Sequence, residues 1–224
     1  MELLLRKGLE HGIKLNLNDM MGRTALHLVA ETGNYNLIGL LLKKSANQTL
    51  RDTLGRTALF LAAENGQNTA VETLLRSSHD AVDIADSHQR TALQVAAEQG
   101  NSSMTKTLLE CSAKRDHQDG SGRTALLLAA ENGEKEVVDL LLKEDAQQEL
   151  ADGNGRTPLL LAVANGDKAI VKALLDHRMA DVTAADRNGR SLLHLAVQSG
   201  NKDVAWLIAE QMTQLQGPRT SDEK

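Results

Sequence analysis

Aromatic residues are almost absent from this 224-residue sequence, which contains one phenylalanine, one tyrosine and one tryptophan. Large rings usually dominate the burial energetics of a protein core. A core without them has to be filled by aliphatic side chains, which suits thin layers of short helices better than one bulky centre. The scarcity of aromatic rings also argues against a protein that binds single-stranded nucleic acid, because such proteins stack the bases on aromatic side chains.

Clusters of basic residues are also missing, and the formal net charge is −5. Nucleic-acid binding needs a positive footprint, so we expect no nucleic-acid partner. The uncharged apolar runs are far shorter than the roughly 20 residues of a membrane span, and the N-terminal apolar run is too short for a signal peptide. Cys111 is the single cysteine, which rules out an internal disulfide. We therefore expect an intracellular, cytoplasmic protein, with the nucleus as an alternative compartment.

A repeated segment is the main feature that the sequence does contain. Residues 122–133 read Gly-Arg-Thr-Ala-Leu-Leu-Leu-Ala-Ala-Glu-Asn-Gly, and the arginine of related segments recurs at steps of 33 or 34 residues. A fixed period in this range is typical of stacked repeat proteins, in which each unit contacts only its neighbours. The six arginines that mark the period are Arg23, Arg56, Arg90, Arg123, Arg156 and Arg190.

The period divides the chain into one partial and six fuller units. The partial unit covers residues 1–17, where the front helix of a unit is missing, so we expect an excerpt of a longer array or an atypical cap. We expect the array to end at residue 212, followed by a disordered tail over 213–224. The fuller units are 18–50, 51–84, 85–117, 118–150, 151–184 and 185–212.

Each unit follows the same local pattern. An aspartate begins a turn, because its carboxylate can accept backbone N–H hydrogen bonds, and a glycine three residues later supplies a positive φ. Gln89 replaces that glycine in unit 85–117; a positive φ there would cost roughly 1 kcal/mol, so we expect a locally altered or looser turn. A threonine such as Thr124 caps a short first helix, which ends at a glycine such as Gly133. Apolar residues at helical spacing then predict a second helix.

This pattern resembles the ankyrin repeat, whose core reads Asp-x-x-Gly-x-Thr-Pro/Ala-Leu-His-x-Ala-Ala-x-x-Gly. The resemblance covers residues 1–212 and implies an all-α ankyrin-repeat solenoid of stacked helix-turn-helix units with projecting turn or hairpin tips. His27 and His194 occupy the histidine position of the family, where the ring helps to tie the turn to the helix. The other four units carry different residues there, so we expect them to depend more on packing. These residues are Phe60, Gln94, Leu127 and Leu160.

The resemblance also implies a function in protein–protein interaction, with a protein or peptide partner on the concave face of the solenoid. Two alternatives remain open at this stage. One is an architectural or autoinhibitory segment that contacts other domains of its own parent chain, and the other is self-association through an N-terminal face near Leu3 and Leu4. By motif position, the candidate partner-binding residues are Met20, Met21, Glu31, Arg51, Leu54, Glu64, His88, Glu98, Glu131, Asn154 and Arg187.

Four of these candidates are glutamates at one register position, which could form an acidic stripe for a basic peptide. The competing interpretation is that glutamate is a well-solvated residue near a helix end, reused as the repeats duplicated. Layers about 8–10 Å apart would give a like-charge repulsion of only about 0.4 kcal/mol in water, so the stripe is tolerable without a partner. For the arginines at the other recurring position, we favour pairing with nearby acidic residues over anion binding.

Three apolar residues, Met20, Met21 and Leu54, fall at predicted turn tips. They could anchor a partner or pack against sequence upstream of the array. Trp206 falls in the last predicted helix at an apolar-periodic place, and we expect it to be core or C-terminal cover rather than an anchor.

Catalytic chemistry finds little support in the sequence. No nucleophile stands beside a plausible base, and no phosphate-binding glycine loop is present. His117 lies near Asp116 and Asp119, and His79 near Asp80, but neither group has a spacing that defines a metal site. We therefore expect no enzyme activity, no catalytic residues, no metal and no cofactor.

Overall fold

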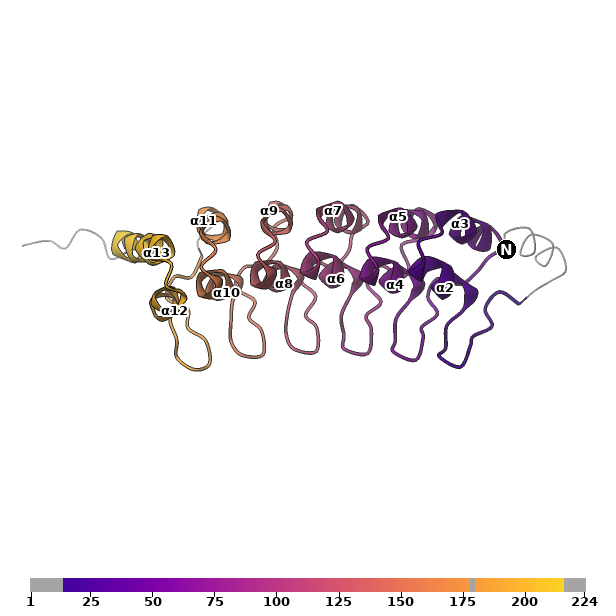
Figure 1. Ribbon diagram of the computed structural model, residues 1–224, viewed down its shortest axis with the longest axis horizontal. Helices are drawn as coiled ribbons and strands as arrows, with labels where there is room; N and C mark the ends of the chain where they lie inside the picture. The colour runs from indigo at the N-terminus through magenta and orange to yellow at the C-terminus, as the bar shows by residue number, and fades with distance from the viewer. Residues whose placement is uncertain (1–13, 178–179, 216–224) are drawn as a thin grey trace, which may run out of the picture.

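The computed structural model describes residues 14–177 and 180–215, which form two parallel rows of helices (Figure 1). The first helices of the units, in the lower row, are α2 (Ala25–Glu31), α4 (Ala58–Glu64), α6 (Ala92–Glu98), α8 (Ala125–Asn132), α10 (Pro158–Asn165) and α12 (Leu192–Ser199). The second helices, in the upper row, are α3 (Tyr35–Lys43), α5 (Asn68–Ser77), α7 (Ser102–Glu110), α9 (Lys135–Lys143), α11 (Lys168–Asp176) and α13 (Lys202–Leu215).

Hairpin-like turns project from the first-helix row, away from the second helices (Figure 1). Pairing of the strand type among the described residues is limited to one isolated bridge, between Ala185 and Ser191. The predicted all-α ankyrin-repeat solenoid is therefore confirmed. None of the helices among residues 14–177 and 180–215 combines the length and apolar character that a membrane span requires.

Local chemistry sets the helix ends as the repeated pattern predicts. The hydroxyl of Thr124 accepts a hydrogen bond from the backbone N–H of Leu127 at 3.2 Å, which caps α8. Gly133 ends the same helix in the left-handed conformation with φ 79°, where a side chain would be strained. The first helices of the other units carry the same Thr or Ser at their start and a positive-φ glycine at or just after their end.

The turn at Gln89 is not looser than the others, so that prediction was wrong. Gln89 adopts the positive φ of its glycine counterparts, at 63°. Its N–H donates to the carbonyl of Asp86 at 3.0 Å, as Gly55 does to Asp52 at 2.9 Å. The carbonyl of Gln89 also accepts a hydrogen bond from Nε2 of His117 at 2.8 Å. The turn thus keeps its geometry, and the hydrogen bond from His117, at the end of the same unit, helps to hold the strained residue in place.

The core is a continuous series of aliphatic layers. Ala129 and Ala130 of α8 are fully buried, and their small size lets α8 pack closely against α6 and α10. On α9, Val137, Val138 and Leu141 are fully buried at the expected helical spacing. Each unit thus buries its apolar face against its neighbours, which is the construction that the period predicts.

Contacts between units also include hydrogen bonds from the family's histidine position. Nε2 of His27 donates to the carbonyl of Arg56 in the next unit at 3.1 Å, while its Nδ1 accepts from the N–H of Thr24 at 3.1 Å. Gln94 makes equivalent bonds: its Oε1 accepts from the N–H of Thr91 at 2.9 Å, and its Nε2 donates to the carbonyl of Arg123 at 2.5 Å. The expectation that unit 85–117 relies on packing at this position was therefore wrong, because the Gln94 amide replaces both ring nitrogens. The other three substituted positions, Phe60, Leu127 and Leu160, are fully buried and apolar.

The ends of the array depart from the predictions in two ways. α13 continues to Leu215, so the helix includes residues 213–215 of the predicted tail. Trp206 is 75% exposed, so the prediction of a core or covering role was wrong. It lies at the register of Asp139 on α9, six residues after the glycine that ends the first helix, and this position faces solvent. The predicted N-terminal face near Leu3 and Leu4 lies outside the described residues.

Candidate functional site

The turn tips and the exposed ends of the first helices form one continuous side of the molecule, called here the first-helix surface (Figure 1). All of the predicted partner-binding residues are exposed or half-buried. Met20 is fully exposed, and Met21 and Leu54 are 48% and 47% exposed. The other exposed members are Arg51, His88, Asn154 and Arg187, and the half-buried members are Glu31, Glu64, Glu98 and Glu131.

A carboxylate organises each turn from the inside. In unit 51–84, Oδ1 of Asp52 accepts hydrogen bonds from the N–H groups of Leu54 and Arg56 at 2.9 and 2.8 Å, and its Oδ2 pairs with the Arg56 guanidinium at 2.8 Å. Burial alone would raise the pKa of Asp52, but these hydrogen bonds and the Arg56 charge outweigh it and hold the pKa below its usual value. The recurring arginines are thus part of the turns, as predicted for the pairing interpretation.

Backbone hydrogen bonds join each tip to the next one. The carbonyl of Met21 accepts from the N–H of Thr53 at 2.9 Å, and the carbonyl of Leu54 accepts from the N–H of Ser87 at 2.8 Å. The same contact recurs along the row, with donor and acceptor pairs Gly120–His88, Gly153–Ser121 and Arg187–Asn154 at 2.7–2.9 Å. The tips therefore form a braced row rather than independent loops, a feature that the sequence pattern did not reveal.

Arg51 is committed to this bracing rather than available to a partner. Its Nε donates to the carbonyl of Gly55 at 2.9 Å, and its Nη2 donates to the carbonyl of Ala85 in the following unit at 2.8 Å. The first bond closes the turn of its own unit, and the second joins that turn to the following unit. Among the predicted binding residues, Arg51 thus has a clear structural role.

The four glutamates do not form a free acidic stripe, because the structure gives each of them an arginine partner. The closest contact joins Oε2 of Glu64 to Nη1 of Arg56 at 2.9 Å, within one unit. Glu64 also approaches Arg90 of the next unit at 3.9 Å. The remaining pairs are Glu31–Arg23 at 3.6 Å, Glu98–Arg90 at 3.9 Å and Glu131–Arg156 at 3.4 Å. Two of these pairs, Glu64–Arg90 and Glu131–Arg156, join neighbouring units. They depend on the distance between the layers, so the register alone could not predict them.

A first hollow lies on the first-helix surface. It has a volume of about 420 Å³ and is formed by residues of α8, α10 and α12 together with Arg156 and Arg190. Its walls combine apolar side chains such as Leu160 and Leu195 with the polar ends of Gln198 and Ser199. Glu131 is the predicted partner-binding residue that lines this hollow, and the interruption of the glutamate series at Ala164 and Gln198 marks the place in the sequence.

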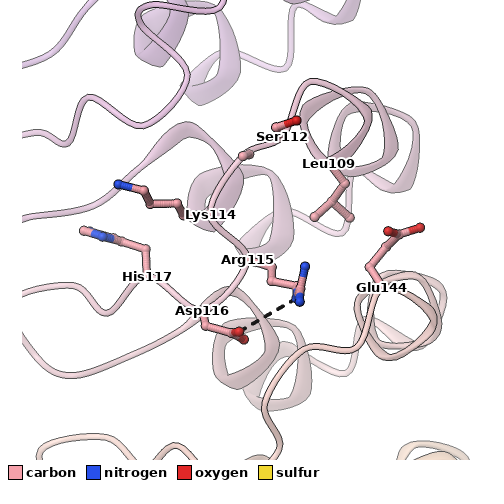
Figure 2. Close-up of a pocket in the computed structure, with 8 residues that line it drawn as sticks. Leu109, Ser112, Lys114, Arg115, Asp116, His117 and Glu144 are labelled. Atoms are coloured by element: carbon pink, nitrogen blue, oxygen red, sulfur yellow. Dashed lines mark ion pairs between the residues drawn. The ribbon is translucent and has the colours of Figure 1, made fainter.

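The second hollow, of about 610 Å³, lies away from the predicted surface, at the loop after α7 (Figure 2). Arg115 points toward the end of α9, where Glu144 lies, whereas Lys114 and His117 point away from Glu144 (Figure 2). Asp116 accepts a hydrogen bond from the N–H of Gln147 at 2.9 Å and lies 3.8 Å from Arg115. The polar groups here join neighbouring loops, so the hollow has the character of a junction between units.

Titratable side chains in the described part of the chain do not gather as a metal site would require. No group of three or more His, Cys, Asp or Glu side chains among residues 14–177 and 180–215 could hold a metal ion. Cys111 is half-buried, and burial raises the pKa of its thiol, which disfavours the reactive thiolate.

Comparison with known families agrees with this geometry. A family model described as ankyrin repeats (3 copies) matches residues 1–87, 77–152 and 144–216. No curated protein matches the sequence. The family matches and the repeated Asp–Gly–Thr turns together place the chain in the ankyrin repeat family.

Proposed function

We propose that this array is a protein–protein interaction scaffold that binds a protein or peptide partner on the first-helix surface. Ankyrin repeat proteins are generally interaction modules and typically non-enzymatic. The observation that carries the proposal is the exposure of Met20, Met21 and Leu54 on tips that are held in a braced row. Flexible apolar side chains on a rigid support suit an adaptable contact surface.

Preorganisation strengthens this interpretation. The tips are joined by backbone hydrogen bonds at 2.7–2.9 Å. The underlying aspartates accept backbone hydrogen bonds within the turns; Asp52, Asp86, Asp119, Asp152 and Asp186 are buried, and Asp19 is exposed. A surface that is already ordered loses little conformational entropy on binding, so more of the contact energy contributes to affinity. Because the four glutamates are paired with arginines, a basic peptide is not the partner that this surface favours. The low cysteine content supports an intracellular location for the complex.

A peptide-display experiment tests the proposal. Random peptides are selected against the immobilised chain, and their affinities are measured by fluorescence anisotropy with the wild type and with a Met20→Asp, Leu54→Asp variant. Both side chains are exposed, so we expect the variant to fold normally by circular dichroism and to bind selected peptides at least about tenfold more weakly.

The matched control carries Tyr35→Asp and Trp206→Asp, which add the same charge at two exposed rings on the second helices α3 and α13. It should bind like the wild type. If both variants lose affinity equally, or if only the control does, the partner surface lies elsewhere. Unfolding of the Met20→Asp, Leu54→Asp variant would show that these side chains belong to the core and would also refute the assignment.

A further inference from the structure

Three arginines of the first-helix surface, Arg23, Arg56 and Arg90, use one particular atom, Nη1, to contact a glutamate eight residues later in the chain. Nε and Nη2 face the aspartate of the turn, as in Arg56, where Asp52 accepts from both. Nη1 then faces outward, toward the end of the first helix. The three units with this arrangement have Nη1–Oε2 distances of 3.6 Å for Arg23–Glu31, 2.9 Å for Arg56–Glu64 and 3.9 Å for Arg90–Glu98.

Arg190 in the last unit lacks this carboxylate. Its Nε and Nη2 both lie 2.7 Å from Oδ2 of Asp186, as in the other turns. Eight residues later the chain has Gln198 in place of a glutamate, and the equivalent position of the preceding unit is Ala164. Across the described residues, no acceptor lies within bonding distance of Nη1 of Arg190. Its side chain is 43% exposed, compared with 18–29% for the other five arginines of the series.

The position at which Arg190 lacks a glutamate partner lies at a hollow of the surface. The cavity of about 420 Å³ between α10 and α12 is lined by Arg190, Gln198 and Ala164 together. Arg156 lines it too, and its partner there is Glu131 of the unit before, at 3.4 Å. Two guanidinium groups and the carboxylate of Glu131 therefore line the hollow, and neither arginine has the glutamate eight residues on that the four preceding units carry.

We propose that this hollow binds a carboxylate from an acidic side chain of the partner, which contacts Nη1 of Arg190 and the side-chain amide of Gln198. The partner's aspartate or glutamate would take the place that Glu64 occupies beside Arg56. Guanidinium–carboxylate hydrogen bonds are among the stronger and more directional polar contacts, and Nη1 and Gln198 are both donors. This inference rests on the proposed function and adds an acidic anchor to the partner, placed at the C-terminal end of the first-helix surface.

The test uses the peptides selected above, synthesised with amidated C-termini so that side chains are the only carboxylates. Each Asp or Glu of a peptide is replaced by its amide, and binding is measured by anisotropy at about 0.1 M salt. We expect one acidic residue whose replacement weakens binding to the wild type about five- to tenfold. In a Gln198→Glu variant, the protein's own carboxylate occupies Nη1 of Arg190. Peptide affinity should then fall by a similar factor, and the same peptide replacement should have less than about a twofold effect.

The control is Gln214→Glu, which makes the same substitution at an exposed position of α13 outside the hollow. It should preserve both the affinity and the effect of the peptide replacement. If Gln198→Glu behaves like Gln214→Glu toward every selected peptide, or if no selected peptide shows the carboxylate dependence, the acidic anchor is refuted and the interaction function stands. If no selected peptide depends on the first-helix surface, both proposals fail.

Discussion

Single side chains differ between units at positions that the fold treats as equivalent, and Thr105 is the clearest case. It lies fully buried on α7 at the register of Val71, Val138 and Val171. Its hydroxyl oxygen is buried with no hydrogen-bond partner. A buried, unsatisfied polar group costs about 1–3 kcal/mol, whereas valine has nearly the same shape without the hydroxyl. Thr105 is therefore a local weakness in an otherwise apolar layer.

The first prediction follows from this comparison. Thr105→Val should raise the free energy of unfolding by about 1 kcal/mol, because it removes the unsatisfied hydroxyl. The reverse change in the next unit, Val138→Thr, should lower the free energy of unfolding by about 1–2 kcal/mol. Urea denaturation followed by circular dichroism measures both values. A destabilised Thr105→Val variant would indicate that the hydroxyl has a partner in solution, such as a bound water.

His27 gives a second prediction, on pH dependence. Burial lowers the pKa of its imidazole below the ordinary value, and its Nδ1 is an acceptor for the N–H of Thr24. The unfolded chain then binds the proton more readily than the folded one, so the stabilising contribution is fully present above the unfolded pKa, near 6.5. It is lost as the pH falls through the folded pKa.

We therefore expect the free energy of unfolding to decrease by about 1 kcal/mol between pH 7 and pH 5, because a protonated Nδ1 can no longer accept a hydrogen bond. His27→Gln, which copies Gln94, should abolish most of this slope and keep the capping bonds. Urea midpoints at pH 7, 6 and 5 make the comparison. Parallel slopes for the wild type and His27→Gln would contradict the assignment of the effect to His27.

At the scale of the element, the sequence predicted features that depend on the local backbone. Thr124 and Gly133 begin and end α8 as expected, because capping and positive φ are properties of neighbouring residues. Gln89 and Gln94 were misjudged, because their behaviour depends on bonds to residues far along the chain: Gln89 accepts from His117 at the end of its own unit, and Gln94 donates to Arg123 of the following unit. A residue's identity does not reveal such a bond until the spacing of the layers is known.

The same distinction applies to the candidate site. The exposure of Met20 and Leu54 was predictable, since tip positions recur with the period. The bracing role of Arg51 was not, because it involves a carbonyl 34 residues away. Trp206 could have been placed correctly by counting from the helix-ending glycine, which puts it at the outward position of Asp139. Apolar periodicity alone misassigned it, because one large ring in a helix is weak evidence of a buried face.

For the molecule as a whole, the stacked arrangement means that stability is a sum of unit and interface contributions. Interior units have two neighbours, whereas the last unit packs only on α10 and α11 within the described residues. Leu128 of α8 and Leu195 of α12 occupy the same register and are both buried, at 1% and 4% exposure. They therefore offer a matched pair in which the same deletion is made at the centre and at the end of the array.

The last prediction compares Leu128→Ala with Leu195→Ala, each of which removes about 2–5 kcal/mol of local packing. Leu195→Ala should open only the end of the array, so amide hydrogen exchange should accelerate in α12 and α13 and stay slow in α4 and α6. Leu128→Ala disrupts the interfaces that connect the two halves, so exchange should accelerate from α6 through α10 and the urea transition should shift as a whole. Equal acceleration in α4 for both variants would mean that the array unfolds as one cooperative body. In that case the hollow beside Arg190 would be as rigid as the central tips. If stability is instead a sum of unit and interface contributions, the hollow lies at the more adaptable end of the proposed binding surface.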